Sequence, residues 1–338
     1  MSSVTGLRPR FKTIYVEQGI ACHPRTGKIL SRFPDAEIIP VSAYTDVFNR
    51  PHQNRRVQQN SQALILAEKK GTRLYPSAPV CQDFGHAFQV CSCVLNCVFD
   101  CDYCWLKGMF DSAYLVVFVN WEDFFQEAET LLSTSPLYLS LAYQCDLVPL
   151  EPWLGCIEAW ASFAKDHPDL WIEIRTKAAS TAVWDHLEAQ ENLIPAFTLS
   201  PDEVISVYEH GTPSLSQRLS AVGFCMERGY NVRLCLDPLL YVPDWQKAYG
   251  SMLDSIVSMI DLSHVRDISL GTFRISLSYL HRMRAQNPSS ALLQYPYESV
   301  NGYARLPKQM RAAMEDWMVE RLAPYIPQEK IFLENNEE

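Results

Sequence analysis

The sequence predicts an α/β protein whose central part is a partial (β/α)6 barrel of the TIM type, and two observations support this class. Short apolar segments of strand length recur through the middle of the chain. An amphipathic pattern with helical period occupies each interval between them. Strands that alternate with helices in this way form a parallel sheet with right-handed crossovers.

The central elements follow one another at regular spacing. The predicted strands are 137–142, 170–175, 194–199, 231–236 and 265–270, and the predicted helices are 121–132, 152–166, 181–190, 214–228 and 245–260. Five or six such units favour a partial barrel over an open doubly wound sheet. In either fold, reactive groups collect at the carboxyl ends of the strands.

Shorter regions flank the predicted barrel. Residues 1–80 are expected to form a small N-terminal α/β region, with strands at 13–17, 36–40 and 63–67 and a helix at 24–33. The barrel itself is assigned to residues 81–280. Residues 281–338 are expected to form a C-terminal extension, with a helix over 310–322 and an extended segment at 331–333.

Composition narrows the class of protein. With 338 residues, 48% of them hydrophobic and 20% charged, the chain resembles an ordinary globular protein. No apolar run reaches the roughly 18 residues that a membrane span needs. The first residues lack the apolar stretch of a signal peptide, so we expect a cytoplasmic protein without a membrane partner. A net charge of −10 argues mildly against nucleic-acid binding by the whole surface.

Cysteines carry the clearest chemical signal. The chain has 11, and five of them lie between Cys91 and Cys104. Cys97, Cys101 and Cys104 follow a C-x3-C-x2-C pattern, in which three thiolates can each bind one iron of a [4Fe–4S] cluster. The alternative is a zinc site, but zinc prefers four ligands in more widely separated pairs. We therefore predict an iron–sulfur cluster.

Such a cluster leaves its fourth iron without a protein ligand. In radical enzymes that iron binds S-adenosylmethionine (SAM), and one electron then cleaves it to a 5′-deoxyadenosyl radical. Tyr103 and Trp105 flank the last cysteine of the motif, which suits this class. Two further cysteines, Cys91 and Cys93, could be a fourth ligand or a redox pair. The favoured interpretation is that they are small buried residues of the strand that precedes the motif.

Several motifs resemble the spore photoproduct lyase family, radical SAM enzymes that reverse a thymine–thymine photolesion in DNA without light. The cluster segment Cys101-Asp-Tyr-Cys104-Trp-Leu is similar to the family's Cys-x-Tyr-Cys-Tyr-Leu. The other similar segments are Ile14-Tyr-Val-Glu, Cys145-Asp146-Leu-Val, Thr176-Lys177, Phe197-Thr198-Leu-Ser200, Glu209-His-Gly211-Thr212-Pro213-Ser with Arg218, and Gly229-Tyr230. The likeness covers nearly the whole chain.

The resemblance implies roles for individual residues. Four of them would line the SAM pocket, namely Cys145, Asp146, Lys177 and Thr198, with Tyr103 and Trp105 beside the cluster. Each of those four lies at the carboxyl end of a predicted strand, where a barrel places its reactive groups. Without the resemblance, Lys177 would be interpreted as a solvent-facing loop residue and Asp146 as a helix N-cap.

Three departures bear on the substrate. Family enzymes return a hydrogen atom from a cysteine three residues before the aspartate, where this chain has Tyr143. Tyr143 and Cys145 are both candidates to replace that donor, so the candidate catalytic residues are Tyr103, Tyr143 and Cys145. Asp237 adds a negative charge at a strand end, which would disfavour a DNA phosphate unless it is paired. The family's basic C-terminal segment is reduced to 301–305.

Three functions are consistent with these residues. The first is a lyase that acts on a pyrimidine photolesion in damaged DNA. The second is a radical SAM enzyme with another substrate, such as an RNA base, a peptide or a metabolite. The third is a non-catalytic iron–sulfur or zinc protein. Either enzyme would need an electron donor such as flavodoxin or ferredoxin.

Overall fold

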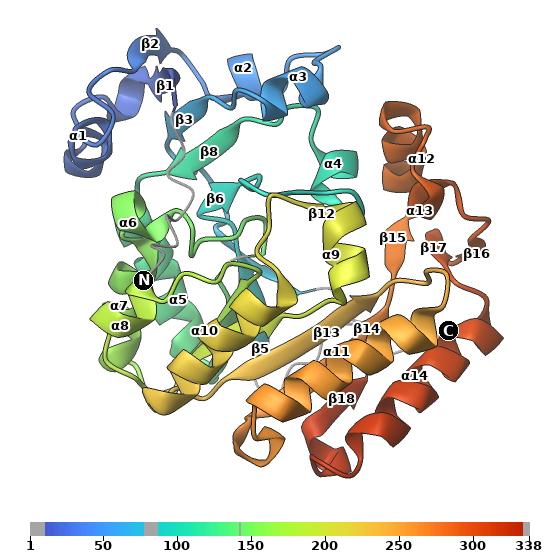
Figure 1. The fold of residues 1–338 in the computed structure, drawn as a ribbon. Coiled ribbons are helices and arrows are strands. Elements are labelled where there is room, and N and C mark those ends of the chain that lie inside the picture. Colours follow the sequence, from blue (N-terminus) through green and yellow to red (C-terminus); the bar gives the residue numbers. More distant parts are fainter. Residues whose placement is uncertain (1–10, 78–86, 142, 334–338) are drawn as a thin grey trace. The chain divides into compact units, whose positions relative to one another are not determined.

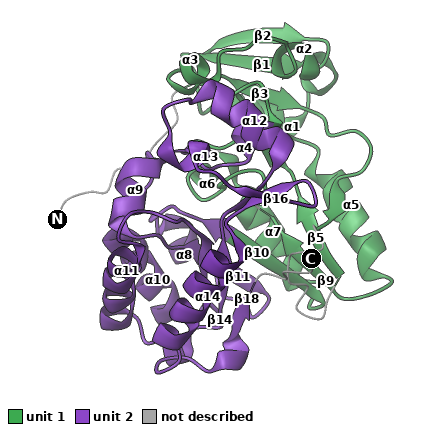
Figure 2. Ribbon diagram, turned by 90° about the vertical axis from the view of Figure 1, so that its right-hand side faces the viewer, with its two compact units in different colours: residues 1–77, 83–98, 109–174 green, residues 78–82, 99–108, 175–338 purple. Residues whose placement is uncertain are grey.

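The computed structural model describes residues 11–77, 87–141 and 143–333. They form two compact units, coloured green and purple in Figure 2. Unit 1 comprises the described residues within 1–77, 83–98 and 109–174, and unit 2 comprises those within 78–82, 99–108 and 175–338. The two units do not test the predicted domains at 1–80, 81–280 and 281–338, and these bounds stay a prediction.

Unit 1 contains a mainly parallel sheet in the order β2-β1-β3-β8-β6 (Figure 1). Its elements are β1 (Thr13–Glu17), η1 (Gln18–Ile20), α1 (Pro24–Leu30), β2 (Glu37–Val41), α2 (Thr45–Phe48), α3 (Arg55–Gln59), β3 (Leu64–Ala67), the antiparallel β6 (Val94–Leu95) and β8 (Leu115–Phe118). All residues of β3 and β8 are buried, as in strands covered on both faces. The three strands predicted near the N-terminus are therefore present.

Unit 1 also carries the strand series β10-β9-β5-β4. These elements are β4 (Leu74–Pro76), β5 (Ala87–Cys91), α5 (Trp121–Leu132), β9 (Leu137–Ser140), α6 (Glu151–Leu154), α7 (Cys156–Lys165) and β10 (Leu170–Thr176), whose last two residues belong to unit 2. The single helix predicted over 152–166 is wrong. Gly155 has φ +73°, a left-handed conformation that ends α6 and that glycine adopts without strain. The predicted strand end at residue 142 lies outside the described residues.

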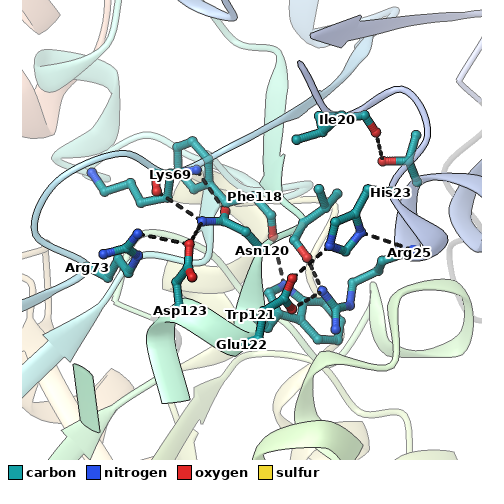
Figure 3. A network of polar contacts seen from close by, with 12 residues as sticks. Ile20, His23, Arg25, Lys69, Arg73, Phe118, Asn120, Trp121, Glu122 and Asp123 are labelled. Atoms are coloured by element: carbon teal, nitrogen blue, oxygen red, sulfur yellow. Dashed lines mark hydrogen bonds and ion pairs between the residues drawn. The ribbon is translucent and has the colours of Figure 1, made fainter. Parts of the chain in front are cut away.

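A polar network holds the start of α5 in unit 1 (Figure 3). Asn120 accepts a hydrogen bond from the backbone N–H of Lys69 at 2.8 Å, and its amide donates to Asp123 at 2.6 Å. On the other side of the helix start, Glu122 binds Nε2 of His23 at 2.8 Å and a guanidinium nitrogen of Arg25 at 3.1 Å. The network therefore ties α5 to the loop that follows β3 and to the start of α1.

Unit 2 contains parallel strands in the order β18-β14-β13-β11. Its elements here are α8 (Ala182–His186), β11 (Leu193–Thr198), α9 (Asp202–Tyr208), α10 (Leu215–Glu227), β13 (Arg233–Leu239), α11 (Trp245–Met259), η2 (Leu262–His264), β14 (Asp267–Thr272) and β18 (Ile331–Leu333). A capping box between Ser214 and Gln217 begins α10, close to the predicted start. A buried ion pair joins Arg233 of β13 to Asp267 of β14.

The remaining elements of unit 2 include strands that the apolar pattern did not predict. They are β7 (Asp100–Cys101), α4 (Leu106–Met109, of which Met109 belongs to unit 1), β12 (Glu209–His210), β15 (Arg274–Ser276), α12 (Leu277–Gln286), α13 (Ala291–Gln294), β16 (Glu298–Val300), β17 (Tyr303–Arg305), α14 (Lys308–Leu322) and η3 (Gln328–Lys330). Three of the strands form an antiparallel sheet in the order β15-β17-β16.

Among the helices that the structure describes, none combines enough length with enough apolar character to cross a membrane.

Candidate active site

The segment that carries Cys101 and Cys104 is anchored by its backbone within unit 2. Strand β7 pairs antiparallel with β12, so that Cys101 lies opposite Glu209. The next backbone N–H, that of Asp102, donates to the carbonyl of Tyr208 at 2.7 Å. The N–H of Cys104 donates to the carbonyl of Cys101 at 3.2 Å, which closes a turn between the two cysteines. We call residues 100–108 the cluster loop.

The three predicted cluster ligands differ in their exposure to solvent. Cys101 is 7% exposed, whereas Cys97 and Cys104 are half-buried. Cys97 belongs to unit 1, where its carbonyl accepts a hydrogen bond from Gln62 at 3.1 Å. In the described part of the chain, no three His, Cys, Asp or Glu side chains are gathered closely enough to hold a metal ion. The donor set suits iron–sulfur chemistry, and the ligand assignment stays a prediction.

Tyr103, Lys177 and Thr198 lie around one charged network in unit 2. The buried phenol of Tyr103 donates a hydrogen bond to Glu209, and Nζ of Lys177 lies 5.4 Å from the centroid of the Tyr103 ring. Thr198 is the last residue of β11, and its carbonyl accepts a hydrogen bond from Arg218 at 3.0 Å. The structure therefore brings these three predicted site residues to the same network.

Burial and charge shift the acidities in this network. Burial raises the pKa of the Tyr103 phenol well above its usual range, and the Glu209 carboxylate adds to the rise. Burial alone would raise the pKa of Glu209 as well, but the charges of Lys177 and Arg218 lower it below its usual value. The Glu209 carboxylate is therefore ionised at neutral pH, and the Tyr103 phenol keeps its proton.

Trp105 and the end of the cluster loop pack against α12. The Trp105 ring stacks on Tyr279 with a centroid distance of 6.5 Å and an interplanar angle of 19°. A Cβ atom placed on Gly108 would lie 2.3 Å from Cβ and 2.6 Å from Cα of Tyr279. Only glycine leaves room for this approach. Neither Gly108 nor Tyr279 was singled out from the sequence, because no local pattern links positions so far apart.

Asp237, the residue whose negative charge was expected to disfavour a phosphate, has a cationic partner in the structure. Arg175 donates hydrogen bonds to the Asp237 carbonyl at 2.6 Å and to its carboxylate at 3.1 Å. Arg175 also donates to Oγ1 of Thr198 at 3.3 Å. The Asp237 carboxylate, which lies within β13 and not at its end, is therefore paired, and a paired carboxylate repels a phosphate less than an unpaired one.

Tyr143, Cys145 and Asp146 form a short segment of unit 1 after β9. Tyr143 is 36% exposed, whereas Cys145 is 9% exposed and its thiol donates to the carbonyl of Asp146 at 3.3 Å. The Asp146 carboxylate accepts a hydrogen bond from the N–H of Val148 at 3.3 Å. Burial raises the pKa of the Cys145 thiol well above its usual range, and Cys97 and Asp146 add to the rise. Cys145 therefore carries an S–H hydrogen at neutral pH.

Cys91 and Cys93 occupy the interior of unit 1. Both are buried, and Sγ of Cys93 lies 3.4 Å from Sγ of Cys156. Burial raises the pKa of Cys91 well above its usual range. Their burial agrees with the interpretation that they are small core residues.

Comparisons with known proteins agree on one family. A profile of the family described as spore photoproduct lyase matches residues 10–294. The spore photoproduct lyase of Bacillus subtilis is 22% identical over 268 residues, which cover 76% of this chain and 75% of that protein. The enzyme of Clostridium acetobutylicum is 23% identical over 164 residues, so this chain spans about half (49%) of that relative's length.

Solved structures of spore photoproduct lyase have a similar fold. A mutant spore photoproduct lyase with bound AdoMet (SAM) and dinucleoside spore photoproduct superimposes with a TM-score of 0.82 at 17% identity. The match covers 96% of this chain and 99% of that one. A second structure, complexed with dinucleoside spore photoproduct, gives a TM-score of 0.80 at 17% identity. This likeness confirms the predicted fold class.

Proposed function

Because the chain belongs to the spore photoproduct lyase family, whose members are radical SAM lyases with a [4Fe–4S] cluster, we propose that it reverses a thymine photolesion in DNA. The observation that carries the proposal is the family match over residues 10–294, which includes every predicted site residue. The fold agrees with it over 96% of the chain.

The proposal assigns cofactors to particular side chains. Cys97, Cys101 and Cys104 would hold the cluster. SAM would lie against five residues, namely Trp105, Cys145, Asp146, Lys177 and Thr198. When bound, the cluster supplies the electron that cleaves SAM to a 5′-deoxyadenosyl radical. The ammonium of Lys177 and the hydroxyl of Thr198 supply polar groups suited to the carboxylate and ribose of SAM.

Reversal of the lesion requires a hydrogen atom to return to the thymine radical. We assign this step to Cys145 first, because its buried thiol retains the S–H hydrogen at neutral pH. Tyr143, which stands where the family has its donor cysteine, is the second candidate. Tyr103 is the weaker catalytic candidate, because its hydroxyl hydrogen is already donated to Glu209.

Two observations favour a second function. The residue that replaces the family's donor is a tyrosine, and the whole chain carries a net charge of −10. A radical SAM enzyme with a different substrate, such as an RNA base, a peptide or a metabolite, would not need the family's hydrogen donor. Both functions need reducing surroundings and an electron donor such as flavodoxin or ferredoxin, and we place the protein in the cytoplasm.

An anaerobic assay separates these functions. The reconstituted protein is reduced with dithionite and given SAM and ultraviolet-irradiated duplex DNA, and both 5′-deoxyadenosine and repaired thymine are measured. Lesion reversal yields repaired thymine. Formation of 5′-deoxyadenosine with an untouched lesion would leave the second function standing and refute the first. Absence of both repaired thymine and 5′-deoxyadenosine would refute both functions.

The ligand assignment has its own test. Ala variants of Cys97, Cys101 or Cys104 are expected to lose most of the iron and of the broad absorption near about 400 nm. Cys91→Ala and Cys93→Ala are matched controls, because these thiols lie in the interior of unit 1. Iron loss in Cys91→Ala equal to that in Cys101→Ala would show that the ligand set is wrong.

A further inference from the structure

The described part of unit 2 contains an ion pair that is buried completely. The side chains of Glu209 and Arg218 are each 0% exposed and contact each other directly. Arg218 also donates hydrogen bonds to the carbonyl of Pro213 at 3.0 Å and to Oγ1 of Thr212 at 2.7 Å. Removing two charges from water is costly, and good geometry with further hydrogen bonds is needed to offset it. Such a pair needs an explanation beyond stability.

Both partners reach the predicted cofactor residues. Glu209 accepts hydrogen bonds from the hydroxyls of Tyr103 and Ser200, the latter at 2.9 Å. Its backbone pairs with Cys101 across the β7–β12 ladder. Arg218 holds the other side, because its guanidinium donates to the carbonyl of Thr198 at 3.0 Å. The pair therefore connects the cluster loop to the carboxyl end of β11.

The hydrogen bonds of this ion pair explain why charged residues occupy these two positions. Glu209 holds one loop by two independent means, its backbone against Cys101 and its side chain against Tyr103. A guanidinium has five N–H donors in a rigid plane, so Arg218 can bind Glu209, Thr198 and Thr212 in one fixed arrangement. An apolar pair of similar volume would pack, but it would not fix these positions.

We propose that Glu209 and Arg218 are positioning residues whose ion pair sets the placement of the Cys101 strand, the Tyr103 ring and the end of β11. This inference deepens the proposed function and rests on it for the identity of the cofactor. The pair does not touch the reacting atoms. It acts through Cys101, Tyr103 and Thr198.

The first test uses the full-length chain without its cluster and does not depend on SAM. Alkylation of thiols by N-ethylmaleimide is followed residue by residue by mass spectrometry under anaerobic, reducing conditions. Glu209→Gln removes the charge and keeps the shape, so it is expected to raise the alkylation rate of Cys101 about tenfold, the effect of losing one charge-assisted hydrogen bond. Cys225 and Cys235, which are buried in the same unit, should stay protected.

The matched control is a second buried ion pair of unit 2. Asp267→Asn disrupts the pair with Arg233, which lies on β13 and β14 and has no part in the assigned site. It should leave the alkylation rate of Cys101 unchanged. An unchanged Cys101 rate in Glu209→Gln, or an equal rise in Asp267→Asn, would overturn the proposal.

A milder variant serves if Glu209→Gln does not fold. Tyr103→Phe removes one hydrogen bond to Glu209 and keeps the ring and the ion pair. It is expected to raise the Cys101 rate about threefold. A rate equal to that of wild type would contradict the proposed role of the Tyr103 bond.

The second test measures positioning toward the cofactor. In reconstituted protein, Glu209→Gln is expected to weaken SAM binding about tenfold while retaining its iron, and to alter the electron paramagnetic resonance spectrum of the reduced cluster with SAM. Asp267→Asn should match wild type in both measurements. Unaltered affinity and spectrum in Glu209→Gln would overturn the proposal. A wild type that binds no SAM would instead refute the proposed function, and the alkylation result would then decide the positioning role alone.

Discussion

Two segments of this protein are held by charged networks, and the two networks differ in their exposure to water. At the start of α5 in unit 1, Glu122 binds His23 and Arg25, and its side chain is 55% exposed (Figure 3). In unit 2, Glu209 binds Arg218 and Tyr103 of the cluster loop's network, and its side chain is not exposed at all. Exposed ion pairs contribute about 0–1 kcal/mol, whereas breaking a buried pair costs about 3–5 kcal/mol. Loss of the exposed ion pair should therefore cost little stability, whereas loss of one partner of the buried pair should cost much more.

The largest effect is expected from leaving one charge of the buried pair alone. Arg218→Met removes the partner of Glu209 and three further hydrogen bonds. We expect the free energy of unfolding to fall by about 3–5 kcal/mol, measured by urea denaturation at pH 7. The double variant with Glu209→Leu should recover part of that loss, because no charge is then left buried. A loss below about 1 kcal/mol in the single variant would contradict the contrast between the two networks.

The second effect concerns the packing of the cluster loop. Gly108→Ala would place a methyl group against the backbone of Tyr279, and the rigid neighbour cannot move aside. We expect a loss of about 3 kcal/mol and a lower iron content after reconstitution. Gly223→Ala is the control, because a Cβ atom placed on Gly223 would have its nearest neighbour, Cδ1 of Ile260, 3.8 Å away. Alanine also favours a helix over glycine by up to about 1 kcal/mol. Equal behaviour of the two variants would refute close packing at Gly108.

A third carboxylate sharpens the comparison, because its hydrogen bonds come from the backbone. Buried Glu151 accepts from the N–H groups of Ile157 and Glu158, both at 2.8 Å. Burial raises its pKa from 4.5 to about 7, despite those hydrogen bonds. The unfolded chain then loses this proton at lower pH than the folded chain, so stability falls as pH rises from about 4.5 to about 7 and levels off above it.

The full difference for Glu151 is about 3 kcal/mol. Glu151→Gln cannot ionise and should lack this part of the pH dependence, so that the gap between variant and wild type changes across the window. Urea denaturation at pH 4.5, 6 and 8 measures it. A gap that stays constant with pH would show that folding leaves the pKa of Glu151 unchanged.

The smallest effect is expected at the exposed network. Glu122→Gln should lower the free energy of unfolding by less than about 1 kcal/mol at 0.1 M salt, and by less still at 1 M salt, because ions screen exposed charges. The pKa of Glu122 is lowered: burial works against the shift, and the hydrogen bond from His23 favours it. A loss as large as that of Arg218→Met would contradict the claim that the exposed ion pair contributes less stability than the buried one.

Local patterns predicted those parts of the fold that depend on neighbours in sequence. The period of apolar residues placed β1 and α5 at their observed bounds, and the cysteine spacing indicated the cluster loop. Glu209 is 106 positions from Tyr103, and no periodicity links them. Only the resemblance drew attention to the segment that contains Glu209 and Arg218, and it did not show that they pair. The break at Gly155 was missed because the apolar pattern continues through it.

The distance along the chain between the cluster loop and its supports has a consequence during protein synthesis. Gly108 packs against Tyr279, which is made about 170 residues later, and Arg218 is made about 120 residues after the loop begins. At roughly 5–20 residues per second, a ribosome needs about 10–30 s to bring Tyr279 out after Gly108. Throughout that interval the cysteines are present without the packing that holds them. Iron delivered to the nascent chain would therefore meet a loop without these supports, and we expect the cluster to assemble after most of unit 2 has been synthesised.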